Sequence, residues 1–193
     1  EKPNLGNLPV APTNRMVTRW AAQVDPACPL PEYPRPQMAR AAWLNLNGPW
    51  DYAILPQDAP APNQFEGKIL VPFALESALS GVGRALLPEQ TLWYRRTFIP
   101  PAQWRGRRAL LHFGAVDWQA RVWLNGHLLG EHRGGYLPFS FEVTQHLNWD
   151  APNELRVAVS DPTDRGDQPR GKQTLNPRGI WYTPISGIWQ TVW

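Results

Sequence analysis

Acidic side chains that could do chemistry cluster once in the sequence, in the stretch Asp161-Pro-Thr-Asp164-Arg-Gly-Asp167. Cleavage of a glycosidic bond usually needs two carboxylates on opposite sides of the bond, about 5 Å apart in a retaining enzyme. Three acids at intervals of three could also bind calcium through oxygen atoms, although an EF-hand uses alternate positions. The simplest interpretation is structural, because Asp-Pro and Arg-Gly-Asp are typical of turns in which Asp side chains accept backbone hydrogen bonds.

The histidines and the cysteine do not suggest a catalytic or metal site. His112, His127, His132 and His146 lack the spacing of a zinc site, such as a pair four residues apart on a helix. Cys28 is alone, which excludes an internal disulfide and a cysteine zinc site. No Ser/His/Asp arrangement and no phosphate-binding glycine loop is present. The sequence therefore predicts no catalytic residues within the chain, no metal site and no cofactor.

Composition narrows the class of protein and its partners. The net charge is only +3, and the tight basic group Arg105, Arg107 and Arg108 sits beside Gly106, which predicts a solvated turn and no nucleic-acid partner. No apolar run approaches the roughly 20 residues that span a bilayer. The sequence starts at Glu1 without an apolar signal core, as in a processed chain or a fragment. It fixes no cellular location, although a periplasmic or secreted one is favoured.

Short strands must position these residues, because 15 glycines and 22 prolines interrupt the chain too often for long helices. The segment 1–40 is rich in proline and is predicted to pack along the surface of a single β domain, residues 41–193. Alternating apolar residues favour strands in that domain, and Asn125-Gly126 predicts a type I′ hairpin turn between two of them. Nine or ten short strands indicate an all-β, two-sheet antiparallel sandwich of the jelly-roll type. An immunoglobulin-like sandwich is the alternative.

Tryptophan is abundant, with 11 residues in the chain. Trp50, Trp93 and Trp123 fall within predicted strands beside aliphatic residues, which favours places in the core. Trp181 and Tyr182 lie in a loop framed by glycine and proline and are predicted to be exposed at an interface or site. The chain ends in a predicted strand from Trp189 to Trp193.

The sequence from about residue 34 to 193 resembles the N-terminal sugar-binding domain of glycoside hydrolase family 2. The resemblance is carried by several motifs in the right order. These are Trp93-Tyr-Arg-Arg-Thr-Phe98, Phe113-Gly-Ala-Val-Asp-Trp118, Val122-Trp-Leu-Asn-Gly126, Gly134-Gly-Tyr-Leu-Pro-Phe139 and Gly187-Ile-Trp-Gln-Thr-Val-Trp193. The resemblance implies a galactose-binding-domain-like fold and a parent enzyme, β-galactosidase-like or else β-glucuronidase-like, whose chain continues beyond residue 193 into a catalytic barrel.

The resemblance also implies which residues meet the substrate. In the family, the loop after the strand Val157-Ala-Val-Ser-Asp161 reaches over the barrel, and an acid in it contacts the terminal sugar. A second sugar-facing loop corresponds to residues 72–84. The substrate-binding residues implied in these two loops are Asp161, Asp164, Lys172, Gln173 and Glu76, with Arg170 beside them. Trp181 is a sixth candidate because of its place in the loop framed by glycine and proline. The family's catalytic glutamates lie in the barrel.

Three functions remain open on the sequence alone. The first is the sugar-binding domain of a glycoside hydrolase, with a carbohydrate and the barrel as partners and self-association through exposed aromatic residues of the terminal segment. The second is a free-standing carbohydrate-binding module. The third is a protein-interaction sandwich without a role in sugar binding. The length of the natural open reading frame distinguishes the first from the second.

Overall fold

A computed structural model describes residues 17–35 and 37–193 of the chain. Its secondary structure is almost entirely β, as predicted. The strands are β1 (Gly48–Pro56), β2 (Gly67–Val71), β3 (Gln90–Phe98), β4 (Leu110–Phe113), β5 (Val116–Asp117), β6 (Gln119–Leu124), β7 (His127–Arg133), β8 (Phe139–Glu142), β9 (Asn153–Ser160) and β10 (Gly187–Ile188). Single 3-10 turns are η1 (Ala21–Gln23), η2 (Ala78–Ser80), η3 (Ala102–Trp104) and η4 (Thr144–His146). In the described part of the chain no helix has the length and apolar character to cross a bilayer.

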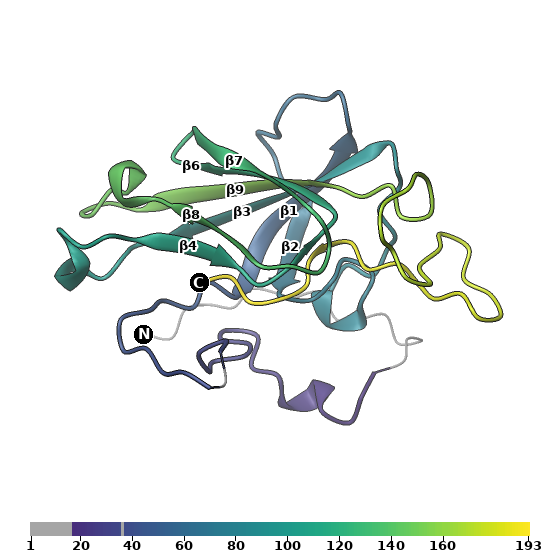
Figure 1. The fold of residues 1–193 in the computed structure, drawn as a ribbon, viewed down its shortest axis with the longest axis horizontal. Coiled ribbons are helices and arrows are strands. Elements are labelled where there is room, and N and C mark those ends of the chain that lie inside the picture. Colours follow the sequence, from purple (N-terminus) through teal and green to yellow (C-terminus); the bar gives the residue numbers. More distant parts are fainter. Residues whose placement is uncertain (1–16, 36) are drawn as a thin grey trace.

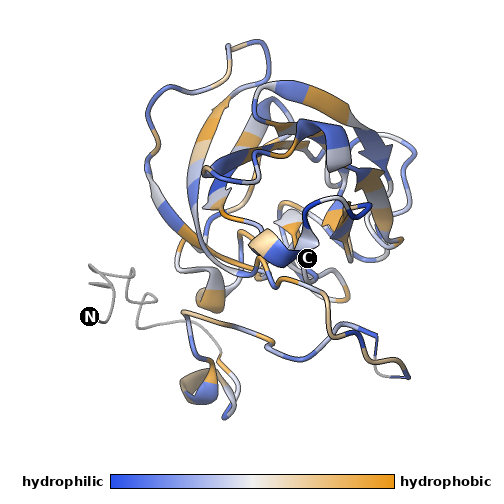
Figure 2. Cartoon of the chain, turned by 90° about the vertical axis from the view of Figure 1, so that its left-hand side faces the viewer, coloured by the Kyte–Doolittle hydropathy of each residue, from blue (hydrophilic) through white to orange (hydrophobic). Residues whose placement is uncertain are grey.

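The strands form a β-sandwich whose pairs are all antiparallel. The larger sheet has the order β2-β1-β3-β9-β6-β7, and β4-β8 and β10-β5 form two small sheets opposite it (Figure 1). The core lies between them, because buried side chains of the large sheet pack with Phe113 of β4 and Ile188 of β10. Seen end-on, the strands surround a common interior (Figure 2). The predicted two-sheet antiparallel sandwich is confirmed.

The strands in the middle of the large sheet differ in how their side chains are buried on its two faces. Strand β3 lies between β1 and β9, and its residues 91–94 are buried on both faces. Trp50 and Tyr94 point inward and meet edge to face, with ring centroids 6.1 Å apart. The prediction that Trp123 is a core residue was wrong. Inward-facing Ala120, Val122 and Leu124 alternate with it, so Trp123 lies half-buried on the outer face, stacked on Trp93 at 5.5 Å.

The predicted hairpin turn at Asn125-Gly126 is confirmed. Both residues have positive φ, 51° and 82°, as a type I′ turn requires, and they join β6 to β7. The Asn125 side chain also ties neighbouring loops together. Its Oδ1 accepts a hydrogen bond from the backbone N–H of Glu154, and its Nδ2 donates to the backbone oxygen of His146.

The end of the chain departs from the predicted regular strand Trp189–Trp193. Strand β10 comprises Gly187 and Ile188, and the segment after it pairs with the chain around β4 irregularly. Its residues still bond to that strand, because the Gly114 N–H donates to Thr191 and the His112 N–H donates to Trp193. Beside these bonds, the Gln190 Cβ lies 2.8 Å from the place where a side chain on Gly114 would begin, so the two segments approach too closely for a side chain there.

The start of the sandwich lies beside its end. The Leu46 N–H donates to the Val192 carbonyl, and Asn47 Oδ1 accepts from the Val192 N–H at 3.0 Å. Asn47 Nδ2 donates to the Pro29 carbonyl, and Tyr33 packs edge-on against Trp193 with centroids 6.4 Å apart. The described part of the proline-rich segment is therefore attached to the domain through these contacts, while residues 1–16 of that segment lie outside the described residues.

Candidate functional site

The longest loop of the sandwich contains most of the residues implied as substrate contacts. It runs from residue 161, directly after β9, to residue 186, directly before β10, and extends beyond the ends of both sheets (yellow-green to yellow in Figure 1). We call it the 161–186 loop. Five of the six predicted residues belong to it, and the sixth, Glu76, lies in the connection after β2.

Asp161 anchors the start of this loop in the interior. Its side chain is 2% exposed. Oδ1 accepts a hydrogen bond of 2.7 Å from the Thr163 N–H, and Oδ2 accepts one of 2.8 Å from Ser186 Oγ at the other end of the loop. Burial raises the pKa of the Asp161 carboxyl above its ordinary value. Asp161 therefore joins the two ends of the loop.

Glu76 is hydrogen-bonded to the same serine, Ser186. The glutamate side chain is 8% exposed, and its Oε2 accepts a 2.8 Å hydrogen bond from the Ser186 N–H. The Leu75 N–H donates to the Ser186 carbonyl, so both backbone groups of Ser186 bond to this connection. Burial raises the pKa of Glu76 to about 7. Glu76 thus holds the end of the 161–186 loop through its hydrogen bond to Ser186.

A third buried acid, Asp117, was missed by the sequence reasoning. It ends β5 and is 4% exposed, and Gln173 Nε2 of the loop donates to its Oδ2 at 3.2 Å. Burial raises its pKa to about 7, and the negative charge of Asp161 adds to the shift. Gly135 is pressed against it, because a Cβ at that position would lie 2.5 Å from the Asp117 carboxylate. We call Glu76, Asp117 and Asp161 the buried acid cluster.

Asp164 holds the outer part of the loop. Its Oδ2 accepts hydrogen bonds from Thr174 Oγ1 at 2.7 Å and from the Leu175 N–H at 3.0 Å, and these bonds lower its pKa. The Arg170 guanidinium donates to the Asp164 carbonyl at 2.8 Å. The turn chemistry that the sequence predicted is found at Asp161, which accepts from the Thr163 N–H two residues later, whereas Asp164 bonds across the loop to residues 10 and 11 positions later. Across residues 17–35 and 37–193, no group of three or more His, Cys, Asp or Glu side chains is placed to hold a metal ion, so the calcium interpretation is not supported.

The outer face of the loop carries aromatic and cationic side chains. Trp181 is 42% exposed and Tyr182 is 63% exposed. The ammonium of Lys172 lies 5.9 Å from the Tyr182 ring centroid, and the Lys172 carbonyl accepts from the Tyr182 N–H at 2.8 Å. Exposed Tyr136 borders the loop at Gly171. We call Tyr136, Lys172, Trp181 and Tyr182 the exposed edge of the loop.

Gln173 connects the two levels of the site. Its Nε2 donates to Asp117, while its Oε1 accepts a 2.6 Å hydrogen bond from the Ile185 N–H. The structure therefore brings Asp161 and Glu76 together through Ser186, and it links Gln173 to Asp117. Lys172 and Trp181 lie apart from these buried acids, on the side of the loop that faces solvent.

Comparison with known sequences identifies relatives of this domain. Residues 80–184 match the family described as glycosyl hydrolase 2 galactose-binding domain-like. A β-galactosidase of Bacteroides ovatus is 33% identical over 159 residues, which cover 82% of this chain and 15% of the relative. A β-galactosidase of Thermoanaerobacter pseudethanolicus is 32% identical over 103 residues, which cover 52% of this chain and 13% of the relative. The chain thus spans less than a sixth of the length of these relatives.

Comparison with solved structures identifies the same fold. A β-glucuronidase of Lactobacillus rhamnosus superposes with a TM-score of 0.60 and 22% identity over 77% of this chain and 27% of that one. A β-glucuronidase from an uncultured Clostridium species gives a TM-score of 0.52 and 26% identity over 64% of this chain and 23% of that one. In both, the similarity is confined to about a quarter of the longer chain.

Proposed function

This chain belongs to the glycosyl hydrolase 2 galactose-binding-domain-like family, and from that premise we propose that it is the substrate-positioning domain of a glycoside hydrolase. The parent enzyme hydrolyses terminal β-glycosides, with a β-galactoside as the first candidate and a β-glucuronide as the second. The relatives named for these two activities are much longer than this chain. We therefore place the catalytic carboxylates in a barrel that follows residue 193.

The observation that carries this proposal is the two-level construction of the 161–186 loop. Its lower level is fixed by the buried acid cluster, and its upper level presents rings and an ammonium to solvent. Aromatic faces and amphipathic side chains of this kind suit contact with a sugar ring. A rigid base under such an edge limits positional error, which is costly to the rate of a reaction on a bound substrate.

The six predicted residues divide into two roles under this proposal. Lys172, Gln173 and Trp181 contact the sugar or the bound aglycone. Glu76 holds the loop through Ser186. Asp161 holds the loop from the interior, where its side chain is 2% exposed. Asp164 holds the outer part of the loop and accepts a hydroxyl hydrogen bond from the terminal sugar, because a carboxylate oxygen can accept two hydrogen bonds.

The test uses the complete enzyme that contains this chain. Trp181→Ala should lower kcat/KM for an aryl β-galactoside or β-glucuronide about tenfold, the equivalent of roughly 1.4 kcal/mol. The melting temperature should stay unchanged, because Trp181 is largely outside the core. Trp20→Ala is the matched control, since Trp20 is also an exposed tryptophan, at 55%, but lies outside the loop. An unchanged kcat/KM for Trp181→Ala would refute the role of the exposed edge.

The isolated chain gives a second test. It should show no turnover of these glycosides, because Asp161, Asp164 and Glu76 hold the loop through hydrogen bonds and the catalytic carboxylates are proposed to lie in the barrel. It should also bind a single sugar only at millimolar concentration or weaker, since a few contacts of about 1–3 kcal/mol are set against the cost of association. Micromolar binding of an oligosaccharide without turnover would instead support a free-standing carbohydrate-binding module.

A further inference from the structure

A pocket of about 250 Å³ opens at the end of the sandwich opposite to the 161–186 loop. It lies between the turn after β3, the η4 turn and the chain terminus, on the side that Figure 2 shows face-on. None of its lining residues belongs to the buried acid cluster or to the exposed edge. The pocket is therefore separate from the proposed sugar site.

The interior of the pocket is apolar. Its lining includes the buried core residues Leu46, Leu111, Leu124 and Val143. Four indole rings complete the apolar walls: Trp43, Trp104, Trp149 and Trp193. An apolar cavity of about 150 Å³ is sufficient to bind benzene. The larger pocket here accordingly has room for one or two fused aromatic rings.

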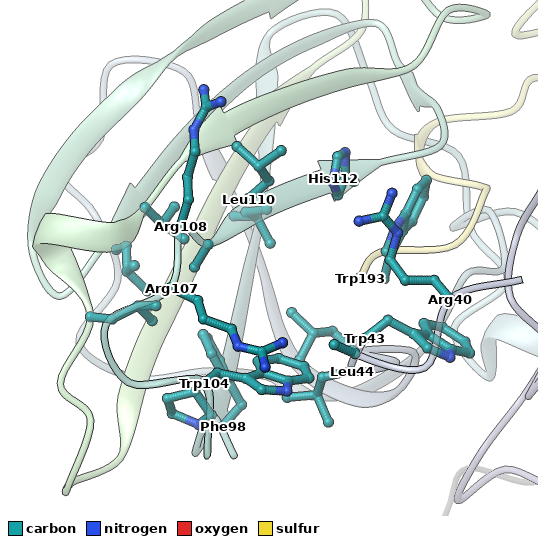
Figure 3. Close-up of a pocket in the computed structure, with 18 of the residues that line it drawn as sticks. Arg40, Trp43, Leu44, Phe98, Trp104, Arg107, Arg108, Leu110, His112 and Trp193 are labelled. Carbon is teal, nitrogen blue, oxygen red and sulfur yellow. The ribbon is translucent and has the colours of Figure 1, made fainter. Parts of the chain in front are cut away.

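The charged residues of the pocket are all basic. Arg40, Arg107 and Arg108 line it together with His112, and no Asp or Glu is among its lining residues. Figure 3 shows Arg40 and Arg107 extending toward the interior from opposite sides, whereas Arg108 turns away. Arg108 forms an ion pair with Glu142. Within the described part of the chain, Arg40 and Arg107 have no ion-pair partner.

His112, which lines the pocket, lies in the positive electrostatic potential of nearby arginines. The imidazole stacks on Trp193, with ring centroids 4.8 Å apart. Burial lowers its pKa, and the positive charges of Arg35 and Arg40 lower it further. The Arg35 guanidinium also lies over Trp193, with its Cζ 5.0 Å from the ring centroid. Positive charge therefore gathers around an apolar cavity, and among its lining arginines only Arg108 has an ion-pair partner in the described part of the chain.

We propose that this pocket binds a small amphipathic anion, an aromatic carboxylate of one or two rings, with its rings among the indoles and its carboxylate between Arg40 and Arg107. A neutral sugar fits less well. Its hydroxyls would face Leu46, Leu111 and Leu124, where they would lose hydrogen bonds to water without gaining partners. The carboxylate stays at the rim, in the positive field of both arginines, where a guanidinium group can donate to it.

The first experiment is calorimetric titration of the complete chain with 2-naphthoate and with the uncharged 2-naphthamide. The carboxylate should bind about three- to tenfold more tightly than the amide, and the difference should shrink at high salt, because the arginines are exposed. Arg40→Gln and Arg107→Gln should each remove most of that difference. Arg105→Gln is the matched control. Arg105 belongs to the same turn but pairs with Asp150 and does not line the pocket.

The second experiment blocks the pocket without disturbing the core. Ala42 lines the mouth and is exposed, so Ala42→Trp should abolish binding of both probes and leave the melting temperature unchanged. Several outcomes would overturn the proposal. They are no binding of naphthoate, equal binding of acid and amide, an equal effect of Arg105→Gln, and binding that survives Ala42→Trp. Loss of binding in the longer parent polypeptide would overturn it too, since the pocket would then be an interface between domains. Glycosidase activity is not a readout, so the proposed function stands or fails separately.

Discussion

Asp117→Asn should stabilise the domain at alkaline pH and have little effect under acidic conditions. Burial raises the pKa of this carboxyl from an ordinary 3.8 to about 7 in the folded chain. The folded state therefore binds more protons than the unfolded state between these two values. The contribution of Asp117 to stability is complete below about pH 3.8 and is lost as the pH rises through 7. Above pH 7 the folded protein must hold a poorly solvated charge.

The magnitude follows from the size of the shift. One pKa unit corresponds to 1.36 kcal/mol, so a shift of about three units corresponds to roughly 4 kcal/mol at most. Asparagine has nearly the same shape and can still accept the hydrogen bond from Gln173 Nε2. Relaxation around the charged group reduces the penalty in the wild type. We therefore expect Asp117→Asn to raise the free energy of unfolding by about 2–4 kcal/mol at pH 8 and by much less at pH 4.5.

The assay is urea unfolding of wild type and variant across pH 4.5–8, followed by tryptophan fluorescence. The wild type should lose stability with rising pH, with a slope of up to about −1.4 kcal/mol per pH unit from each of Asp117 and Glu76. In Asp117→Asn, the part of this pH dependence that comes from Asp117 should be absent. Asp58→Asn, a change at an exposed carboxyl, should shift stability little at any pH. An equal effect of Asp117→Asn at pH 4.5 and pH 8 would show that Asp117 does not gain a proton on folding, and the reasoning would be refuted.

Two further substitutions test the geometry. Gly187→Ala should destabilise the domain by about 3 kcal/mol in denaturant unfolding, because its Cβ would lie 2.0 Å from Tyr94 Oη at a residue with φ of 88°. Gly126→Ala has a similar φ but open space around it, so a cost as large as that of Gly187→Ala would contradict the steric argument. Asp164→Ala should speed hydrogen exchange at the Leu175 amide about tenfold, through loss of an N–H bond to a charged group. Asp167→Ala should leave that amide unchanged, and equal exchange in the two variants would show that Asp164 does not hold the loop.

The fold could be predicted from local patterns, and the exceptions have physical reasons. Alternating residues identified most strands, and Asn125-Gly126 identified a hairpin, because each signal depends on neighbours in sequence. Trp123 was misplaced because its residue type outweighed the alternation of its own strand. The irregular end of the chain depends on its pairing with the segment around β4, which lies far away in the sequence.

The candidate site was less accessible to sequence reasoning. The turn role of Asp161 could be predicted, since its partner Thr163 lies two residues away, whereas the partners of Asp164 lie 10 and 11 residues away. Glu76 meets Ser186 from 110 residues away, and Gln173 meets Asp117 from 56 residues away. No local pattern shows that such a carboxylate is buried. The one signal for Asp117 was its place in the otherwise apolar Phe113–Trp118 segment.

The contacts of Asn47 have a consequence for how the chain folds during synthesis. Its side chain bonds to Val192 and Thr191, 145 and 144 residues later, and the backbone of Leu46 bonds to Val192 as well. A ribosome adding 5–20 residues per second needs roughly 7–30 seconds to make that stretch. During this interval the strand edge at β4 and the core residues around it have no terminal segment to pack against. The nascent domain therefore exposes apolar surface around β4 until residues 191 and 192 have been made.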